Sequence, residues 1–156
     1  PGTGVGSATR NTLVGGANNG KEHIHTQGLD ACNHDHDSGW KLTNVQKPMK
    51  LLAANTDQSV MLQCDFGTVL ETGNDPVAWI NANPGRIHSM HLKDWSPEKG
   101  YRVLFGEGIA DWPKIFAAAE SKGGIEYSLI EQEGSEYSEM ETAERCLAAY
   151  RKIHGH

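Results

Sequence analysis

Three short segments of the chain combine apolar and polar residues and read as strands, and each segment ends in a residue with a metal-ligand side chain. The segments are residues 60–65, 87–91 and 127–131. In the first two, every second residue forms an apolar face that is expected to meet helices, with Val60, Leu62 and Cys64 in one and Met90 and Leu92 in the other. The last residues are Asp65, His91 and Glu131. A helix-like stretch follows each segment, so the chain repeats strand and helix, which indicates a parallel sheet with right-handed crossovers.

The stretches between the strands carry the signals of helix starts. Pro48 and Pro76 stand at favoured first helical positions, and Asp75 is the N-cap before Pro76. Ser138 and Glu141 form a capping box that predicts a final helix. In that helix Met140, Ala143, Leu147 and Tyr150 share one face, and Cys146 falls on a face that is expected to be buried. With a short strand expected within residues 29–36, the pattern predicts an α/β fold of about four parallel β/α units.

The first 28 residues differ from the rest of the chain. Glycine recurs there among small polar residues, with no sustained helical or strand period. We therefore expect residues 1–28 to form a flexible or partner-docked segment, and residues 29–156 to form the folded domain. The chain starts at Pro1 and not at a methionine, which is compatible with a processed product, a fragment or part of a longer chain.

Composition excludes some classes of function. The net charge of −6 and the isoelectric point near 5.7 argue against a nucleic-acid surface. No apolar run approaches the roughly 18 residues of a membrane span. Three widely spaced cysteines without a CxxC pair do not make a disulfide framework. A cytoplasmic protein is therefore expected, with export before Pro1 left open.

The ends of the three predicted strands indicate a site. Because the carboxyl ends of parallel strands meet at one edge, Asp65, His91 and Glu131 should lie in one layer. Oxygen and imidazole ligands from neighbouring strands suit a catalytic divalent metal. The alternative is a fold kept for packing, in which these side chains satisfy one another by hydrogen bonds.

Five spaced motifs carry a resemblance to a known family. They are residues 62–67, 75–79, 84–87 together with 91–94, 105–108 and 130–134. In this order they resemble the sugar phosphate isomerase/epimerase family, the xylose isomerase-like branch of the TIM barrels. The resemblance spans roughly residues 29–154 and implies a partial TIM-type barrel, the C-terminal half with about the last four β/α units.

The resemblance implies a metal centre. Family members bind Mn, Mg, Co or Zn through Glu, Asp, His and Glu at strand ends, and Asp65, His91 and Glu131 match the last three ligands. Where many relatives place the first Glu, this chain has residues 33–37, which include two histidines. His34 is the candidate for the fourth ligand, and His36 is the candidate for contact with a sugar hydroxyl.

The resemblance also implies a reaction. A divalent ion would polarise a substrate carbonyl and the adjacent hydroxyl, and Glu131 would take the proton beside the carbonyl to give an enediolate. Returning the proton to another face or carbon would epimerise or isomerise a sugar, sugar phosphate or cyclitol. Lys93 is a second candidate catalytic residue, while Glu107 and Trp95 are candidates for binding substrate on the loops above the strands.

The rival hypothesis is a non-catalytic half-barrel that serves as a structural or accessory subunit of a larger assembly. Four strands leave two open edges and an exposed inner face, so a homodimer or a second chain is expected to complete the barrel. A metal-dependent nuclease is a weaker alternative, because the acidic charge opposes phosphate binding.

Overall fold

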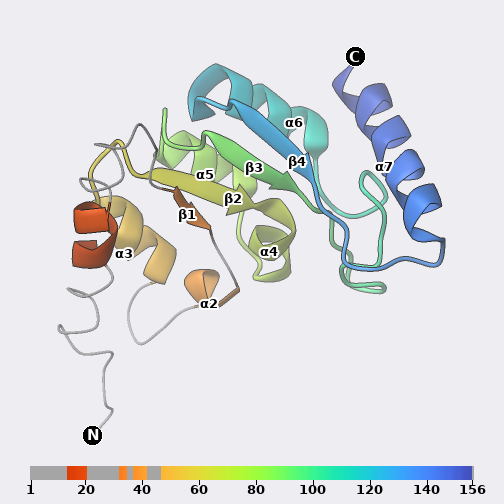
Figure 1. Cartoon of the computed structure of the whole chain (residues 1–156), viewed down its shortest axis with the longest axis horizontal. Helices are drawn as coiled ribbons and strands as arrows, with labels where there is room; N and C mark the ends of the chain where they lie inside the picture. Colours follow the sequence, from red (N-terminus) through yellow and green to blue (C-terminus); the bar gives the residue numbers. More distant parts are fainter. Residues whose placement is uncertain (1–13, 21–31, 35–36, 42–46, 156) are drawn as a thin grey trace, which may run out of the picture.

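The computed structural model describes residues 14–20, 32–34, 37–41 and 47–155. Its strands are β1 (Cys32–His34), β2 (Met61–Asp65), β3 (Ser89–Leu92) and β4 (Tyr127–Ile130). Its helices are α2 (Asp37–Trp40), α3 (Pro48–Asn55), α4 (Phe66–Glu71), α5 (Pro76–Ala82), α6 (Trp112–Ala118), the π-helix η1 (Ala119–Gly123) and α7 (Glu139–His154). The strands form one parallel sheet in the order β1-β2-β3-β4 (Figure 1). The predicted parallel α/β fold is thereby confirmed.

The predicted helix starts at Pro48, Pro76 and Glu139 are confirmed, and the last two have side-chain caps. Asp75 accepts hydrogen bonds from the backbone N–H groups of Val77 and Ala78, at 2.9 and 3.2 Å. Ser138 accepts one from the N–H of Glu141 at 3.4 Å. These oxygens satisfy donors that the first turn of a helix leaves without a partner, so short local sequences define where the helices begin.

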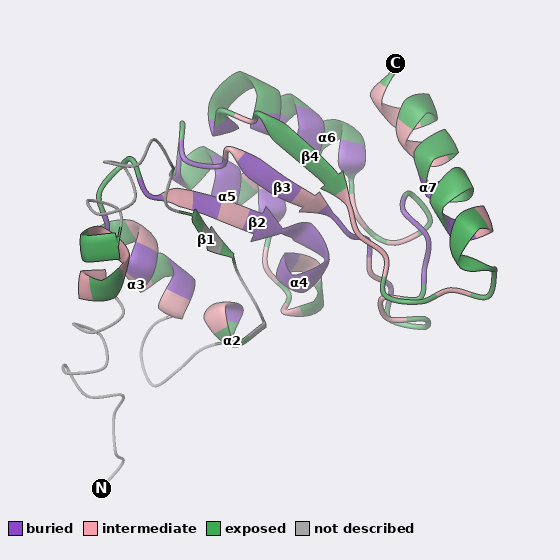
Figure 2. Ribbon diagram, viewed as in Figure 1, coloured by how far each residue is buried: buried purple, intermediate pink, exposed green. Residues whose placement is uncertain are grey.

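The core lies between the sheet and the helices on one of its faces. Leu62 and Cys64 of β2 and Met90 and Leu92 of β3 are fully buried there, as the alternation predicts. Trp40 joins them, and its ring meets that of Trp79 edge-on, with centroids 4.7 Å apart. Figure 2 shows the buried residues concentrated in β2, β3 and the sides of the helices that face the sheet.

Residues 14–20 form a helix that the sequence pattern did not predict. Asn18 joins this helix to the end of α3: its side chain donates to the carbonyl of Asn55 at 3.3 Å and accepts from the N–H of Asp57 at 3.0 Å. Ala17 packs against the core. The remainder of residues 1–28 lies outside the described residues, and the domain boundary near residue 28 stays a prediction.

The face of α7 that carries Met140, Ala143, Leu147 and Tyr150 is exposed at its first three members, whereas the predicted burial of Cys146 is confirmed. Met140 is 72% exposed and Leu147 is 41% exposed, whereas Thr142 and Cys146 are buried. Tyr150 does pack, with its ring near those of Phe105 and Phe116. The periodicity correctly identifies an apolar stripe, but α7 meets the rest of this chain with an adjacent face. Among the described residues no helix has the length and apolar character needed to cross a membrane.

Candidate metal centre

The sheet register brings the three predicted ligands together. Asp65 and His91 are direct partners on β2 and β3. His91 pairs with Leu129 of β4, and Glu131 follows two residues later, with its N–H bonded to the carbonyl of Leu92 at 3.4 Å. All three residues therefore stand at the carboxyl edge of the sheet, where ligands bind in parallel α/β folds.

The ligand atoms of these residues converge. One atom each from Asp65, His91 and Glu131 lies within 4.8 Å of the other two. The Nδ1 atom of His91 is hydrogen-bonded to Oε2 of Glu131. Asp65 ends β2 and also caps α4, since its Oδ1 accepts from the N–H of Thr68 at 3.0 Å. The strand-to-helix junction thus directs the other oxygen, Oδ2, towards the cluster.

Lys93 supplies the positive charge of the cluster. Its Nζ lies 2.5 Å from Oδ2 of Asp65, 3.4 Å from Oε1 of Glu131 and 2.8 Å from Oε1 of Glu133. The side chain is only 6% exposed and its ammonium also lies 4.6 Å from the ring centre of Tyr101. Burial alone would lower the pKa of Lys93, but the hydrogen bonds to Asp65 and Glu133 and the nearby negative charges raise it above its ordinary value. Lys93 is therefore charged at neutral pH.

Glu131 receives interactions on both of its oxygens. Burial raises its pKa, but the charge of Lys93 and the hydrogen bond from His91 outweigh burial and lower the pKa below the ordinary value. The carboxylate is consequently ionised at neutral pH and available as a ligand or base. Glu133, two residues further on, shares Lys93 with it.

His34 lies beside the cluster. Its ring centre is 4.8 Å from that of His91, and its Nδ1 is hydrogen-bonded to Oε1 of Gln63 at 2.6 Å. Gln63 in turn donates to the hydroxyl of Ser89 at 2.7 Å. Sequence reasoning missed Gln63 as a site residue, although it shares the strand face of Asp65. His34 is not one of the three converging ligands, and His36 lies outside the described residues.

The two remaining candidates stand on the loop between β3 and α6. Glu107 is exposed, and its charge acts on Arg145 and Cys146 of α7, so the structure places it beside that helix. Trp95 is half-buried, and its carbonyl accepts from the N–H of Ile109 at 2.9 Å. The substrate-binding roles of Glu107 and Trp95 stay predictions.

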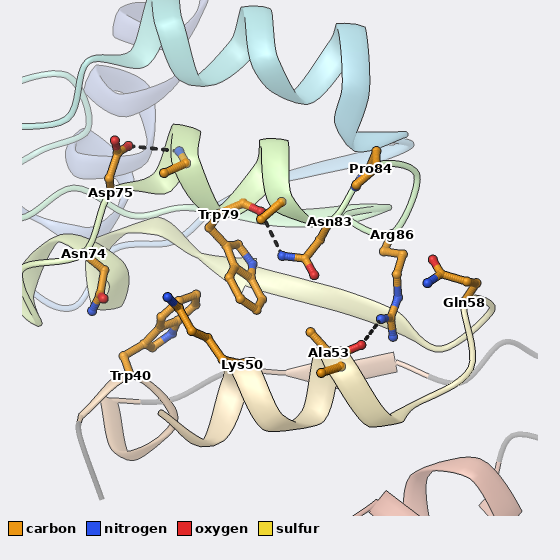
Figure 3. Close-up of a pocket in the computed structure, with 13 residues that line it drawn as sticks. Trp40, Lys50, Ala53, Gln58, Asn74, Asp75, Trp79, Asn83, Pro84 and Arg86 are labelled. Carbon is orange, nitrogen blue, oxygen red and sulfur yellow. Dashed lines mark hydrogen bonds between the residues drawn. The ribbon is translucent and has the colours of Figure 1, made fainter. Parts of the chain in front are cut away.

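A separate cavity of about 510 Å³ lies between α3 and α5 (Figure 3). Trp40, Lys50 and Trp79 are among the residues that line it, and none of its lining residues belongs to the cluster. Arg86 closes one end, where its guanidinium donates to the carbonyls of Ala53 and Val60 at 2.7 and 3.0 Å. This arginine ties α3 to the sheet, so its role at the cavity is structural.

Comparisons with known proteins agree with the fold. The L-ribulose-5-phosphate 3-epimerase UlaE of Salmonella paratyphi C is 34% identical over 84 residues, which are 54% of this chain and 29% of that protein. A sugar phosphate isomerase/epimerase from Parabacteroides distasonis superposes with a TM-score of 0.81 at 24% identity, covering 94% of this chain and 52% of the other. A xylose isomerase-like TIM barrel/4-hydroxyphenylpyruvate dioxygenase fusion protein gives 0.69 at 19% identity, over 92% and 25%. No protein-family model matches the chain.

The chain therefore spans less than a third of the curated epimerase that it matches, and about half of the related barrel from Parabacteroides distasonis. The predicted α/β half-barrel agrees with these coverages and with the parallel four-stranded sheet. The predicted resemblance to the sugar phosphate isomerase/epimerase family, with its xylose isomerase-like TIM barrel, is confirmed for this part of the fold.

Proposed function

We propose that the chain carries the metal centre of a sugar isomerase or epimerase that moves a proton next to a carbonyl. The convergence of Asp65, His91 and Glu131 at the carboxyl edge of the sheet is the observation that carries this proposal. The matched curated relative is an epimerase of a ketopentose phosphate. A sugar, a sugar phosphate or a cyclitol is the proposed substrate class, and a cytoplasmic location is proposed with it.

The donor set fits a divalent ion. Two carboxylates and one imidazole are ligands that Mn, Co and Zn accept, and the carboxylates also suit Mg. In the structure the ammonium of Lys93 supplies the positive charge in place of an ion, because it contacts the oxygens of Asp65 and Glu131 that would hold the ion. A bound ion would supply a Lewis acid for a carbonyl and its neighbouring hydroxyl. His34 is the proposed fourth ligand.

The protein residues provide the proton transfer. Glu131 is the proposed base that takes the proton beside the carbonyl, because it is ionised and only partly buried. His91 holds one oxygen of this carboxylate and Lys93 lies near the other, so both neighbours orient it. The ammonium of Lys93 would then stabilise negative charge on the substrate oxygen of the enediolate. Glu131 can return the proton to the neighbouring carbon, which isomerises the substrate, whereas inversion of the first carbon requires a proton delivered to the opposite face by water or by a second acid.

The experiment is metal analysis together with deuterium exchange from solvent into L-ribulose 5-phosphate and L-ribulose. The parent chain should retain about one Mn²⁺ after desalting. Asp65→Ala should lose the ion, and Glu131→Gln should slow exchange by about 10³-fold. Glu126→Gln is the matched control, since Glu126 forms a similar pair with His88, at 2.8 Å, outside the cluster. A parent chain without metal or exchange would contradict the proposal.

The second candidate is a non-catalytic half-barrel in a larger assembly, and one observation favours it. Lys93 and His91 already neutralise or hydrogen-bond the acidic groups of the cluster in the structure. A cluster whose acidic groups are hydrogen-bonded in this way can serve packing alone, without a metal. Under this alternative, Asp65→Ala and Glu131→Gln would change stability while the parent chain shows no metal-dependent exchange.

A further inference from the structure

The cavity between α3 and α5 is separate from the metal cluster and large enough to hold a small molecule. Its volume of about 510 Å³ falls within the usual range of ligand pockets. Because α3 precedes β2 and α5 precedes β3, its two walls come from consecutive β/α units. Figure 3 shows Lys50 extending from α3 and Trp79 extending from α5 into the space between these helices.

The indole of Trp79 carries a hydrogen-bond donor that has no acceptor within the described part of the chain. The residue is only 6% exposed, and its Nε1 atom is buried. The neighbouring amide of Asn83 is a donor too, and it bonds to the backbone carbonyl of Trp79 at 2.9 Å. A buried donor without an acceptor costs free energy, and an acceptor atom of a ligand would recover it.

The apolar lining of the cavity suits an aromatic ring. Trp40 and Trp79 both line it, and their rings meet edge-on with centroids 4.7 Å apart. Ala53 of α3 and Ala78 of α5 also line it, and their small side chains leave room between the helices. A flat ring can pack against the indoles in the offset or edge-to-face arrangements that aromatic pairs prefer.

The charged groups around the cavity favour an anionic ligand. Lys50 and Arg86 line it, and Lys47 donates a hydrogen bond to the lining residue Asn74. The opposing carboxylates are Asp57, whose charge acts on Arg86, and Asp75, which caps α5. Three cationic groups therefore face two acidic ones. Lys50 is exposed, and its ammonium has no ionic partner among the residues that the structure describes.

We propose that this cavity binds a small aromatic carboxylate. The ring of the ligand packs against Trp40 and Trp79, one carboxylate oxygen accepts from the indole N–H of Trp79, and Lys50 supplies the opposite charge. Because Nε1 is buried in the cavity wall, the indole ring has to turn for the carboxylate to reach it. This binding site goes beyond the proposed isomerase or epimerase function, and it requires neither a metal nor proton transfer.

The experiment is calorimetric titration of the chain with 2-naphthoate in the presence of a chelator, with the uncharged 2-naphthalenemethanol as the matched compound. The dissociation constant of 2-naphthoate should lie below about 1 mM, and that of the alcohol should be at least about tenfold higher. Lys50→Met should weaken binding of 2-naphthoate by about fivefold, because it removes the charge and keeps most of the apolar stem. Lys99→Met is the matched control, since Lys99 is exposed on the loop between β3 and α6 and does not line the cavity.

Nuclear magnetic resonance of chain labelled with ¹⁵N-tryptophan tests the contact with Trp79. The chain has four tryptophans, and Trp79→Phe identifies the indole signal of Trp79 by its loss. Addition of 2-naphthoate should move this signal downfield, because the N–H gains a charged acceptor. Trp79→Phe should also weaken binding by about tenfold, since the ring remains and the donor is lost.

Absence of 2-naphthoate binding up to about 10 mM would overturn the proposal. Binding that Lys50→Met leaves unchanged would also overturn it, and so would binding without a shift of the Trp79 signal. Lys50 is exposed, so its substitution keeps the test valid if Trp79→Phe impairs folding. Because a chelator is present throughout, the result is independent of whether the metal-centre proposal holds.

Discussion

Among single residues, Lys93 has the largest influence on the cluster. Its buried ammonium contacts Asp65, Glu131 and Glu133, and no apolar side chain of similar size could replace that charge. The same ammonium stands close to oxygens that a divalent ion requires. Lys93 therefore stabilises the metal-free protein, and it would compete with the metal of the proposed function. Substitution can separate these two effects.

Lys93→Met should destabilise the metal-free chain and increase the stabilisation that Mn²⁺ provides. Removing one partner of a buried ion pair leaves the carboxylates uncompensated, which costs on the order of 3 kcal/mol. An ion that no longer competes with the ammonium binds more tightly, and tighter binding raises the melting temperature further. Thermal melts of both proteins with and without Mn²⁺ measure this difference.

Lys114→Met is the control for this prediction, because Lys114 pairs with Asp111 at an exposed position. Its effect on stability should be small, because an exposed ion pair contributes little to the free energy of unfolding. An increase in melting temperature on Mn²⁺ addition that is no larger in Lys93→Met than in the parent chain would count against competition.

Among the structural elements, the loop between β3 and α6 depends on one buried carboxylate. Asp94 is 1% exposed. It accepts hydrogen bonds from the backbone N–H groups of Gly106, Gly108 and Ala110 at 3.0, 3.1 and 3.3 Å, and from the indole of Trp112 at 2.9 Å. A side chain at Gly108 would overlap Asp94, so the loop needs glycine at this point. The loop thereby holds Lys93 and Trp95 in position.

Asp94→Asn should lower the free energy of unfolding by about 3 kcal/mol, because an amide offers one acceptor oxygen and turns its NH₂ group towards other donors. Chemical denaturation measures this change. Asp111→Asn is the matched control: Asp111 caps α6 through the N–H of Lys114, and asparagine is an equally good cap. If both variants lost the same free energy of unfolding, the hydrogen bonds of Asp94 would contribute no more to stability than the cap of α6.

For the whole molecule, the three cysteines report on folding. Cys32 is exposed on β1, whereas Cys64 and Cys146 are buried. Burial raises the pKa of the Cys146 thiol, and the charge of Glu107 adds to this effect, while a backbone hydrogen bond from Phe105 opposes it. At neutral pH the reactive thiolate of Cys146 is therefore scarce.

One thiol per chain should react quickly with a disulfide reagent in the folded protein, and the others only after unfolding. The rate at Cys146 should continue to rise with pH above the range where an ordinary thiol levels off, because its pKa is raised. Mass spectrometry of partly labelled protein identifies each site, and fast labelling of Cys146 would contradict its burial.

The sequence by itself determined the features that depend on neighbouring residues. The short strand-like segments placed Asp65, His91 and Glu131 at strand ends, and parallel strands bring such ends to one edge. Caps such as Asp75 and Ser138 defined helix starts, because their hydrogen bonds span only two or three residues. These short-range patterns were sufficient to predict the parallel α/β fold and the candidate ligands.

Only the tertiary structure decided the contacts between distant segments. Lys93 meets Glu131 across 38 residues, and Asp94 meets the indole of Trp112 across 18. The exposure of the apolar face of α7 could not be predicted from the sequence either, since periodicity identifies an apolar stripe but not the surface that covers it. The physical reason is that ion pairing and burial depend on which elements pack together, whereas strand alternation and helix capping are properties of the local chain.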